Sequence, residues 1–352
     1  MENTNTRVIK VNSLKPEKKA IIEGAELIKK GGLVAFPTET VYGLGANGLD
    51  PKAVAKLFTA KGRPQDNPLI LHVYSIEQVR ELVEDISEEA ERLMRIFWPG
   101  PLTLLFKRGN KIPEIITAGL DTVAIRMPNN PIALELIKAS GVPIAAPSAN
   151  TSGKPSPTMA NHVREDLWGK VNLIIDGGST GVGLESTVLD LTGNKPIILR
   201  PGGITLENLQ KIIPNVEEDL SIIKDDKKIV PKSPGQKYRH YAPKAEMLLF
   251  TGEVDALVNG ISRQAKELIQ QGKKVGIMAT DETVGRYEEG TIISLGSRKN
   301  KETIAHNLFN TLRLLDDAKV DIILCEGMEM SGIGTAIMNR LKKASSGNIK
   351  MV

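Results

Sequence analysis

The chain has 352 residues, more than a single hydrophobic core usually holds (~250 to 300), so the sequence predicts two domains. Charged residues make up 25% and hydrophobic residues 41% of the chain, as in ordinary globular proteins. The formal net charge of +4 is small for this length, so it allows an anionic ligand without requiring nucleic acid.

The single cysteine, Cys325, excludes an intrachain disulfide and a zinc site built from thiolates. It lies in an apolar run and is predicted to be buried. The first ten residues are polar, and no apolar run approaches the ~18 residues that span a bilayer. We therefore expect a cytoplasmic protein with no membrane partner.

In chain order, residues 1–213 alternate short apolar strands with amphipathic helices. Strands are predicted at residues 7–11, 33–36, 69–73, 102–107, 122–126, 142–146, 172–176, 187–190 and 197–199, and helices at 16–30, 51–60, 76–97 and 131–140. Residues 37–45 are predicted to be a glycine-bearing loop. Because several strands follow one another directly, the pattern indicates an α/β fold of the α+β kind, with a mixed sheet.

Residues 214–244 are charged, marked by prolines and without periodicity, and are predicted to be a linker. After it, strands predicted at 247–250, 274–278, 291–295 and 322–325 alternate with helices at 254–271, 301–318 and 334–344. This alternation predicts a small open α/β sheet in residues 245–352.

The segment from Lys61 to His72 is a basic loop that leads into a short apolar strand. Lys61 and Arg63 flank a glycine, so two cations can approach one anion without a side chain between them. Pro64 and Pro68 stiffen the loop, and Asn67 offers a donor and an acceptor. The segment is typical of a phosphate-binding loop, although taken alone it also fits a solvated basic turn.

Polar clusters recur at the ends of the predicted strands. They comprise Thr38–Tyr42, Lys61–His72, Thr122–Arg126, Ser148–Asn150, Glu185–Thr187 and Arg200. Open sheets bind ligands at strand ends, so these clusters can converge on one cleft. Its cations would be Lys61, Arg63, Arg126 and Arg200, which suits a polyphosphate together with a carboxylate. Taken singly, each cluster is also explained as a turn, a helix cap or a surface charge.

Other signals of chemistry are weak. The glycines from Gly43 to Gly48 match the dinucleotide-binding fingerprint in letters, but they do not directly follow a strand or open a helix. The four histidines have no metal-ligand spacing, and no Ser/His/Asp or Cys/His set is visible. Covalent catalysis is therefore not expected.

Five segments resemble, in order and spacing, the Sua5/YrdC family of threonylcarbamoyl-AMP synthases. They are Pro37-Thr-Glu-Thr-Val-Tyr-Gly-Leu, Lys61-Gly-Arg-Pro-x-x-Asn-Pro-Leu, Ala146-Pro-Ser-Ala-Asn, Glu185-Ser-Thr-Val and Leu199-Arg-Pro-Gly. Residues 233–243, followed by a small α/β unit, resemble the two-domain Sua5 form.

The resemblance implies that ATP, L-threonine and bicarbonate or CO2 react to give threonylcarbamoyl-AMP and pyrophosphate. The adenylate would pass to a tRNA threonylcarbamoyl transferase complex, for t6A at position 37 of tRNAs that read codons beginning with A. The resemblance also implies a twisted YrdC-like catalytic domain at 1–213, a linker at 214–244 that can fold over the site, and a Rossmann-like Sua5-type domain at 245–352.

The same resemblance implies roles for individual residues. The motif residues Lys61, Arg63, Ser148 and Asn150 would be catalytic. Threonine would be bound by Thr40, His72, Arg126 and Ser186. The nucleotide would be bound by Arg63, Asn67, Thr122, Ser148, Ser156 and Arg200, with Tyr238, His240 and Tyr241 from the linker. Because the clusters hold few carboxylates, Mg2+ is expected to arrive with ATP rather than in a protein cage.

Two alternatives stay open at this point. One is an RNA-binding module that grips tRNA or double-stranded RNA, which predicts binding that depends steeply on salt and not on ATP. The sequence has no Arg/Lys run and only 4% aromatic residues, which favours the enzyme, with weak RNA binding as an addition. The other alternative is a related carbamoyl transfer.

Overall fold

The computed structural model describes residues 4–219 and 240–352, so Tyr238 lies outside the described residues. The chain divides into two compact units. Unit 1 holds the described residues up to 219, except 153–155 and 182–184, which group with residues 240–352 as unit 2. Each unit is described by itself.

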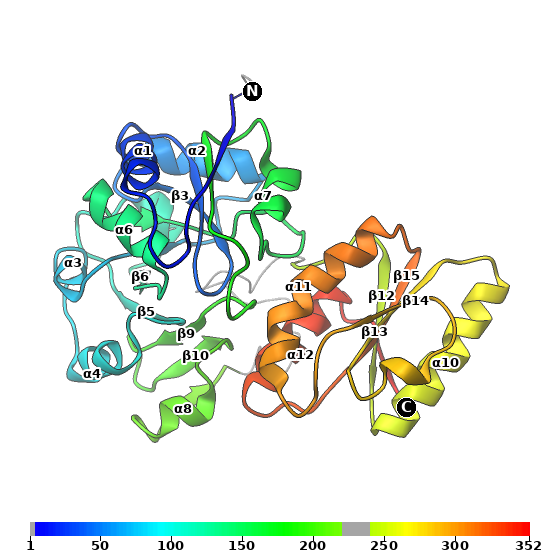
Figure 1. The fold of residues 1–352 in the computed structure, drawn as a ribbon. Coiled ribbons are helices and arrows are strands. Elements are labelled where there is room, and N and C mark those ends of the chain that lie inside the picture. Colours follow the sequence, from blue (N-terminus) through cyan, green and yellow to red (C-terminus); the bar gives the residue numbers. More distant parts are fainter. Residues whose placement is uncertain (1–3, 220–239) are drawn as a thin grey trace. The chain divides into compact units, whose positions relative to one another are not determined.

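Unit 1 is built on one sheet of mixed direction (Figure 1). Its strands are β1 (Arg7–Lys10), β2 (Val34–Pro37), β3 (Tyr42–Asn47), β4 (Ile70–His72), β5 (Leu102–Lys107), β6 (Thr122–Arg126), β7 (Ile144–Ala145), β8 (Leu173–Asp176), β9 (Thr187–Asp190), β10 (Ile197–Arg200) and β11 (Glu217–Glu218). Their order is β1-β8-β2-β3-β7-β4-β6-β5-β9-β10-β11. Parallel pairs such as β4/β6 alternate with antiparallel pairs such as β5/β6, which confirms the predicted mixed sheet.

The helices of unit 1 cover this sheet with apolar faces. They are α1 (Lys18–Lys29), α2 (Pro51–Lys61), α3 (Ile76–Arg80), α4 (Glu88–Phe97), α5 (Glu114–Thr117), α6 (Pro131–Ser140), α7 (Ala160–Leu167) and α8 (Leu206–Gln210). Ile28 of α1 and Leu136 of α6 pack with Leu173 of β8 in one core. Val54 and Leu57 of α2 belong to the other, larger core of the unit.

The prediction of one helix over residues 76–97 is wrong, because the structure has two helices, α3 and α4, with a break between them. The Ser87 side chain accepts a hydrogen bond from the backbone N–H of Ala90 and so begins α4. In the break, Val83 forms a β-bridge with Arg108. The apolar residues keep a helical spacing across the break, so the sequence pattern predicts one helix where the structure has two.

The prediction of a loop over residues 37–45 is wrong from Tyr42 onward, where β3 begins and pairs antiparallel with β2. The glycines of β3 allow close packing rather than a turn. A Cβ added to Gly45 would lie 2.8 Å from both Ile144 Cγ2 and Phe36 Cε1. The strand thus depends on glycine where β2 and β7 contribute large side chains.

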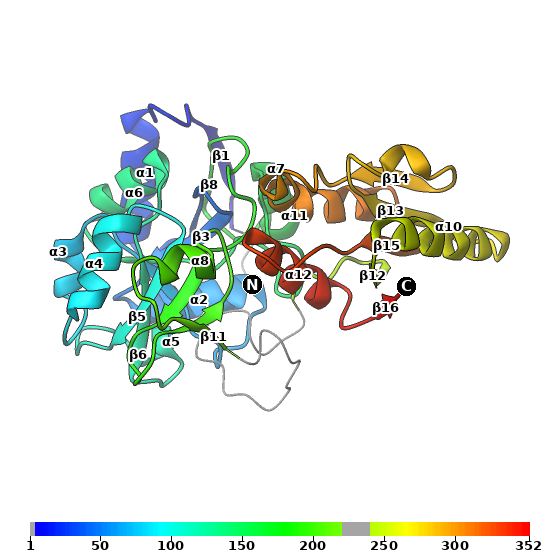
Figure 2. The ribbon, with the colours of Figure 1, turned by 90° about the horizontal axis from the view of Figure 1, so that it is seen from below.

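Unit 2 is a parallel sheet with helices on both faces (Figures 1 and 2). Its strands are β12 (Glu246–Thr251), β13 (Val275–Ala279), β14 (Thr291–Ser294), β15 (Ile322–Glu326) and β16 (Ile349–Met351), in the order β14-β13-β15-β12-β16. Its helices are α10 (Val254–Gln270), the short 3-10 turn η1 (Val284–Arg286), α11 (Lys301–Asp317) and α12 (Ile333–Ala344). The predicted open α/β sheet is confirmed, and Cys325 is buried in β15 as expected.

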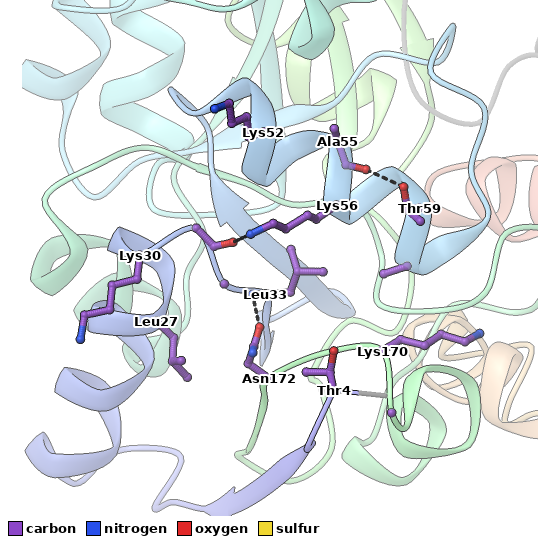
Figure 3. A pocket seen from close by; sticks show the side chains of 14 residues that line it. Thr4, Leu27, Lys30, Leu33, Lys52, Ala55, Lys56, Thr59, Lys170 and Asn172 are labelled. Atoms are coloured by element: carbon purple, nitrogen blue, oxygen red, sulfur yellow. Dashed lines mark hydrogen bonds between the residues drawn. The ribbon is translucent and has the colours of Figure 1, made fainter. Parts of the chain in front are cut away.

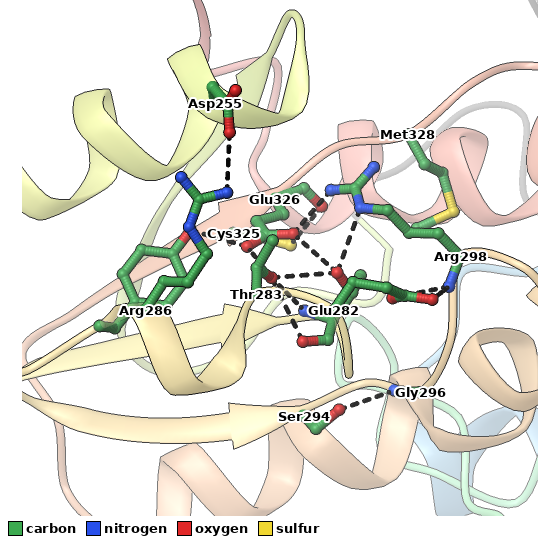
Figure 4. A network of polar contacts seen from close by, with 12 residues as sticks. Asp255, Glu282, Thr283, Arg286, Ser294, Gly296, Arg298, Cys325, Glu326 and Met328 are labelled. Carbon is green, nitrogen blue, oxygen red and sulfur yellow. Dashed lines mark hydrogen bonds and ion pairs between the residues drawn. The ribbon is translucent and has the colours of Figure 1, made fainter.

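A buried polar network closes one end of this second sheet (Figure 4). The Glu326 carboxylate, 0% exposed, accepts hydrogen bonds from the hydroxyls of Thr283 (2.5 Å) and Tyr287 (2.7 Å) and from the Arg298 guanidinium (2.6 Å). Burial and this carboxylate raise the pKa of Tyr287. Because every interaction we describe here is made within unit 2, we interpret the network as scaffold.

Within residues 4–219 and 240–352, none of the helices has the length and apolarity needed to cross a membrane.

Candidate active site

Lys61 is the last residue of α2, and its side chain points into unit 1. Gly62 follows with a left-handed φ of 62°, which turns the chain away from the helix. The Lys61 ammonium donates to the carbonyl oxygens of Ser148 and Asn150, the latter at 2.5 Å. Burial, and then the charge of Arg63, hold the pKa of Lys61 well below its ordinary value.

Ser148 and Asn150 bind this lysine, and Arg63 follows it two residues later in the chain. Ser148 Oγ donates to Asn150 Oδ1 at 2.5 Å, and Gly43 forms a β-bridge with Ser148 that fixes the loop to β3. The Arg63 guanidinium donates to the Pro68 carbonyl oxygen at 3.1 Å. The structure therefore brings together the four residues that the sequence suggested as catalytic.

A second cluster forms around Arg126. His72 and Arg126 are opposite each other on the parallel strands β4 and β6. Arg126 Nη1 donates to Thr40 Oγ1 (3.0 Å), and Nη2 lies 2.6 Å from Glu39 Oε1. Burial, and next the charge of Arg126, lower the pKa of His72 to about 3, so its imidazole is neutral at pH 7.

The third cluster joins the start of β9 to the end of β10. Arg200 donates through Nε to the Ser186 carbonyl oxygen and through Nη2 to Ser186 Oγ, both at 3.0 Å. Ser186 Oγ also shares a hydrogen bond with Thr103 Oγ1 at 2.7 Å. The Ser156 hydroxyl donates to the Glu185 carboxylate at 2.5 Å.

Electrostatic effects connect the three clusters. The charge of Glu185 acts on Lys61, and the charges of both Arg126 and Arg200 act on His72. The strands that carry these clusters, or lead into them, are consecutive neighbours in the sheet, in the order β7-β4-β6-β5-β9-β10. The clusters therefore form one site within unit 1, rich in cations and hydroxyl groups.

The nucleotide is also predicted to contact Thr122, His240, Tyr241 and Asn67. Thr122 begins β6, at the opposite end of that strand from Arg126, and pairs with Lys107. His240 and Tyr241 belong to unit 2, where Tyr241 is 5% exposed and its ring lies 5.1 Å from that of Phe309. Asn67 is buried, and its Oδ1 atom has no hydrogen-bond partner in the described parts of the chain.

Sequence reasoning missed Glu39 and Thr103 as members of the site. Glu39 lies between two threonines in the motif that begins at Pro37. Its negative charge was the sequence feature that could have identified it as a partner for a cation. Thr103 lies in the otherwise apolar strand β5. A single hydroxyl group there does not change the apolar pattern, which predicts a buried strand. Only the contacts of these side chains with Arg126 and Ser186 reveal them.

A hollow of about 690 Å³ lies elsewhere on unit 1, along the exposed side of α2 (Figure 3). Four lysines are among its lining residues: Lys30, Lys52, Lys56 and Lys170. Their side chains are exposed, and Lys56 donates to the Gly31 carbonyl oxygen. Exposed lysines are typical of a solvated face, and none of the predicted site residues lines this hollow.

The fold and the site define a two-unit chain whose unit 1 is a mixed sheet that carries cations and hydroxyl groups suited to an anionic ligand. Residues 26–202 match the Sua5, YciO and YrdC family model, described as "Telomere recombination". Residues 204–346 match the model described as "Threonylcarbamoyl-AMP synthase, C-terminal domain". The chain belongs to the Sua5/YciO/YrdC family.

Relatives align over nearly the whole chain. A threonylcarbamoyl-AMP synthase of Pyrococcus abyssi is 52% identical over 322 residues, which is 91% of this chain and 92% of the relative. The Bacillus subtilis protein of the same name is 47% identical over 94% of each chain. The crystal structure of P. abyssi Sua5 complexed with L-threonine superposes with a TM-score of 0.94 at 49% identity, over 98% of this chain and 99% of that one.

Proposed function

We propose that the protein is an L-threonylcarbamoyladenylate synthase, a nucleotidyltransferase that joins threonine, bicarbonate or CO2, and the AMP part of ATP. The observation that carries the proposal is that adjoining strands and loops of unit 1 hold three cationic clusters, built on Lys61, Arg126 and Arg200. Such a site can hold an amino acid beside a triphosphate. The similarity to P. abyssi Sua5, whose solved structure holds L-threonine, supports it.

The Arg126 cluster would bind threonine. The guanidinium suits the α-carboxylate, because two parallel N–H groups can bind its two oxygens. A neutral His72 can exchange hydrogen bonds with the side-chain hydroxyl without repelling Arg126. Thr40 and Ser186 would complete this part of the site.

The Lys61 and Arg200 clusters would bind ATP, with Arg63, Asn67, Thr122, Ser148, Asn150 and Ser156 around it. The deprotonated threonine amine adds to CO2, supplied as such or by dehydration of bicarbonate, and releases a proton to give a carbamate. A carbamate oxygen then attacks the α-phosphate, and pyrophosphate leaves with the bonding electrons. Cations near the α-phosphate and the leaving group stabilise the charge that develops there. No residue of the chain needs to form a covalent bond, because positioning the reactants can supply ~7 to 11 kcal/mol.

Mg2+ would enter with ATP and neutralise phosphate charge. The described residues contain no group of three His, Cys, Asp or Glu side chains that could hold a metal ion. Of the site's carboxylates, Glu39 lies against Arg126 and Glu185 accepts from Ser156. The residues therefore fit a nucleotide-borne ion better than a resident one.

The product is a labile mixed anhydride, so it would pass to a tRNA threonylcarbamoyl transferase complex for t6A37 in tRNAs reading ANN codons. We place this reaction in the cytoplasm, where ATP and tRNA are available. The expected part of Tyr238, His240 and Tyr241 in nucleotide binding stays a prediction. Weak RNA binding by the enzyme is retained as a secondary proposal.

The direct experiment is mass detection of threonylcarbamoyl-AMP after incubation of the full chain with ATP, Mg2+, L-threonine and bicarbonate. We expect the adenylate and pyrophosphate only when all the substrates are present. Pyrophosphate release that does not need threonine would contradict the proposal. RNA binding that is strong, steeply salt-dependent and unaffected by ATP, without adenylate formation, would favour the RNA-binding alternative.

A further inference from the structure

Glu39 is a buried carboxylate whose hydrogen-bonding capacity is unused. Its side chain is 13% exposed, and neither carboxylate oxygen accepts a hydrogen bond from the described residues. An ionised carboxylate has about four acceptor positions. Leaving them empty and away from water is costly, so such a group points to a missing donor.

The neighbouring Arg126 has unused capacity of the opposite kind. Its Nε and Nη1 groups donate to Gly100 and Thr40, whereas Nη2 makes no hydrogen bond with any described group. Nη2 and Glu39 Oε1 lie 2.6 Å apart, as an ion pair whose geometry does not satisfy a hydrogen bond. The site thus presents adjacent positive and negative groups that can both take a further partner.

This pair of charges matches an α-amino acid, whose ammonium and carboxylate groups are attached to the same carbon atom. The carboxylate would bind Arg126, and the ammonium, with three donors, would fill the acceptor positions of Glu39. A ligand with a hydroxyl in place of the amine offers Glu39 one donor instead of three and no positive charge, so most of its acceptor positions would stay empty. That penalty discriminates against the wrong ligand.

We propose that Glu39 binds the amino group of the substrate and makes the site selective for amino acids over hydroxy acids. The inference rests on the proposed function for the identity of the amino acid. Thr38 and Thr40 support the arrangement, since their hydroxyls share a 2.9 Å hydrogen bond and flank Glu39 on both sides.

The test compares L-threonine with 2,3-dihydroxybutanoate, in which a hydroxyl group replaces the amine. Isothermal titration calorimetry would measure the binding of both ligands to the unchanged chain and to Glu39→Gln. We expect the unchanged chain to prefer threonine, and Glu39→Gln to weaken threonine binding by about 10- to 100-fold. The variant should bind the hydroxy acid nearly as well as before, so the preference disappears.

Glu23→Gln is the matched control, since Glu23 forms an ion pair with Arg7 near the surface, and it should keep the full preference. Glu39→Asp keeps the charge and provides a second variant if Glu39→Gln does not fold. It should retain a preference for threonine, although a smaller one, because the shorter aspartate side chain holds its carboxylate farther from the amino group. An equal loss for both ligands in Glu39→Gln would indicate a merely structural role and overturn the inference.

The readout also separates this inference from the proposed function. If the unchanged chain makes the adenylate but Glu39→Gln keeps its preference for threonine, the inference fails alone. If the preference depends on Glu39 but no adenylate forms, the proposed function fails and the amino-acid site stands.

Discussion

The side chains of His72 and Arg126 are attached to directly opposed residues of the parallel strands β4 and β6. Burial of the histidine, reinforced by the charge of Arg126, lowers the pKa of its imidazole to about 3. A neutral imidazole beside a permanent cation can act as hydrogen-bond donor or acceptor toward a polar ligand. The neutral state of His72 therefore matters both for ligand binding and for the stability of unit 1.

Stability should fall as the pH is lowered, because His72 takes up a proton near pH 6.5 in the unfolded chain but only near pH 3 when folded. The contribution of His72 is complete above pH 6.5 and decreases between pH 6.5 and 3. Between pH 7 and pH 5 it amounts to roughly 2 kcal/mol. Urea unfolding of the unchanged chain and of His72→Gln at both pH values would measure it.

The variant should lose less stability than the unchanged chain over this interval. Identical pH dependence in His72→Gln and the unchanged chain would contradict the prediction.

Lys61→Met should slow adenylate formation strongly while leaving the fold intact. Methionine preserves the apolar stem of the side chain but removes the ammonium group that bonds the Ser148 and Asn150 carbonyl oxygens. Loss of a transition-state contact of this kind costs about 10² to 10³ in kcat. The measurement is threonine-dependent pyrophosphate release, with circular dichroism as the test of folding.

The matched control is Lys56→Met, on the exposed side of the same helix, which should keep normal activity. A fully active Lys61→Met would exclude Lys61 from the reaction.

Arg298→Met should destabilise unit 2 by about 3 to 5 kcal/mol, because it leaves the Glu326 carboxylate buried without its cation. Thermal unfolding should show the loss in the transition of unit 2. Arg286→Met is the control, since its ion pair with Asp255 is exposed at 42% and 83% and should contribute about 0 to 1 kcal/mol. Equal effects of the two substitutions would show that the buried network is not stabilising.

Much of the fold could be predicted from sequence because apolar periodicity and turn residues are local signals. Thus α1, α6 and the strands β12 to β15 lie where the pattern placed them, whereas β16 was not predicted. The break between α3 and α4 was missed because one serine cap decides it.

The Lys61, Ser148 and Asn150 cluster could be suggested from motifs, whereas the pairing of Glu39 with Arg126 could not, since the two are far apart in sequence. Tyr241 was assigned by motif, and only the structure shows its ring against Phe309.

Gly45→Ala should destabilise unit 1 by about 1 to 3 kcal/mol, although alanine is ordinarily acceptable in a strand. The added Cβ would lie 2.8 Å from both Ile144 and Phe36, so β2 or β7 would have to move. Phe36 also makes an edge contact with His72, with the ring centres 6.5 Å apart, so the movement should reach the site. We therefore expect lower stability and weaker threonine binding together, measured by urea unfolding and calorimetry. Gly285→Ala is the control, because a Cβ there meets no atom within 4 Å, and it should leave both properties unchanged. A stable Gly45→Ala with normal threonine binding would show that β3 does not need its glycine.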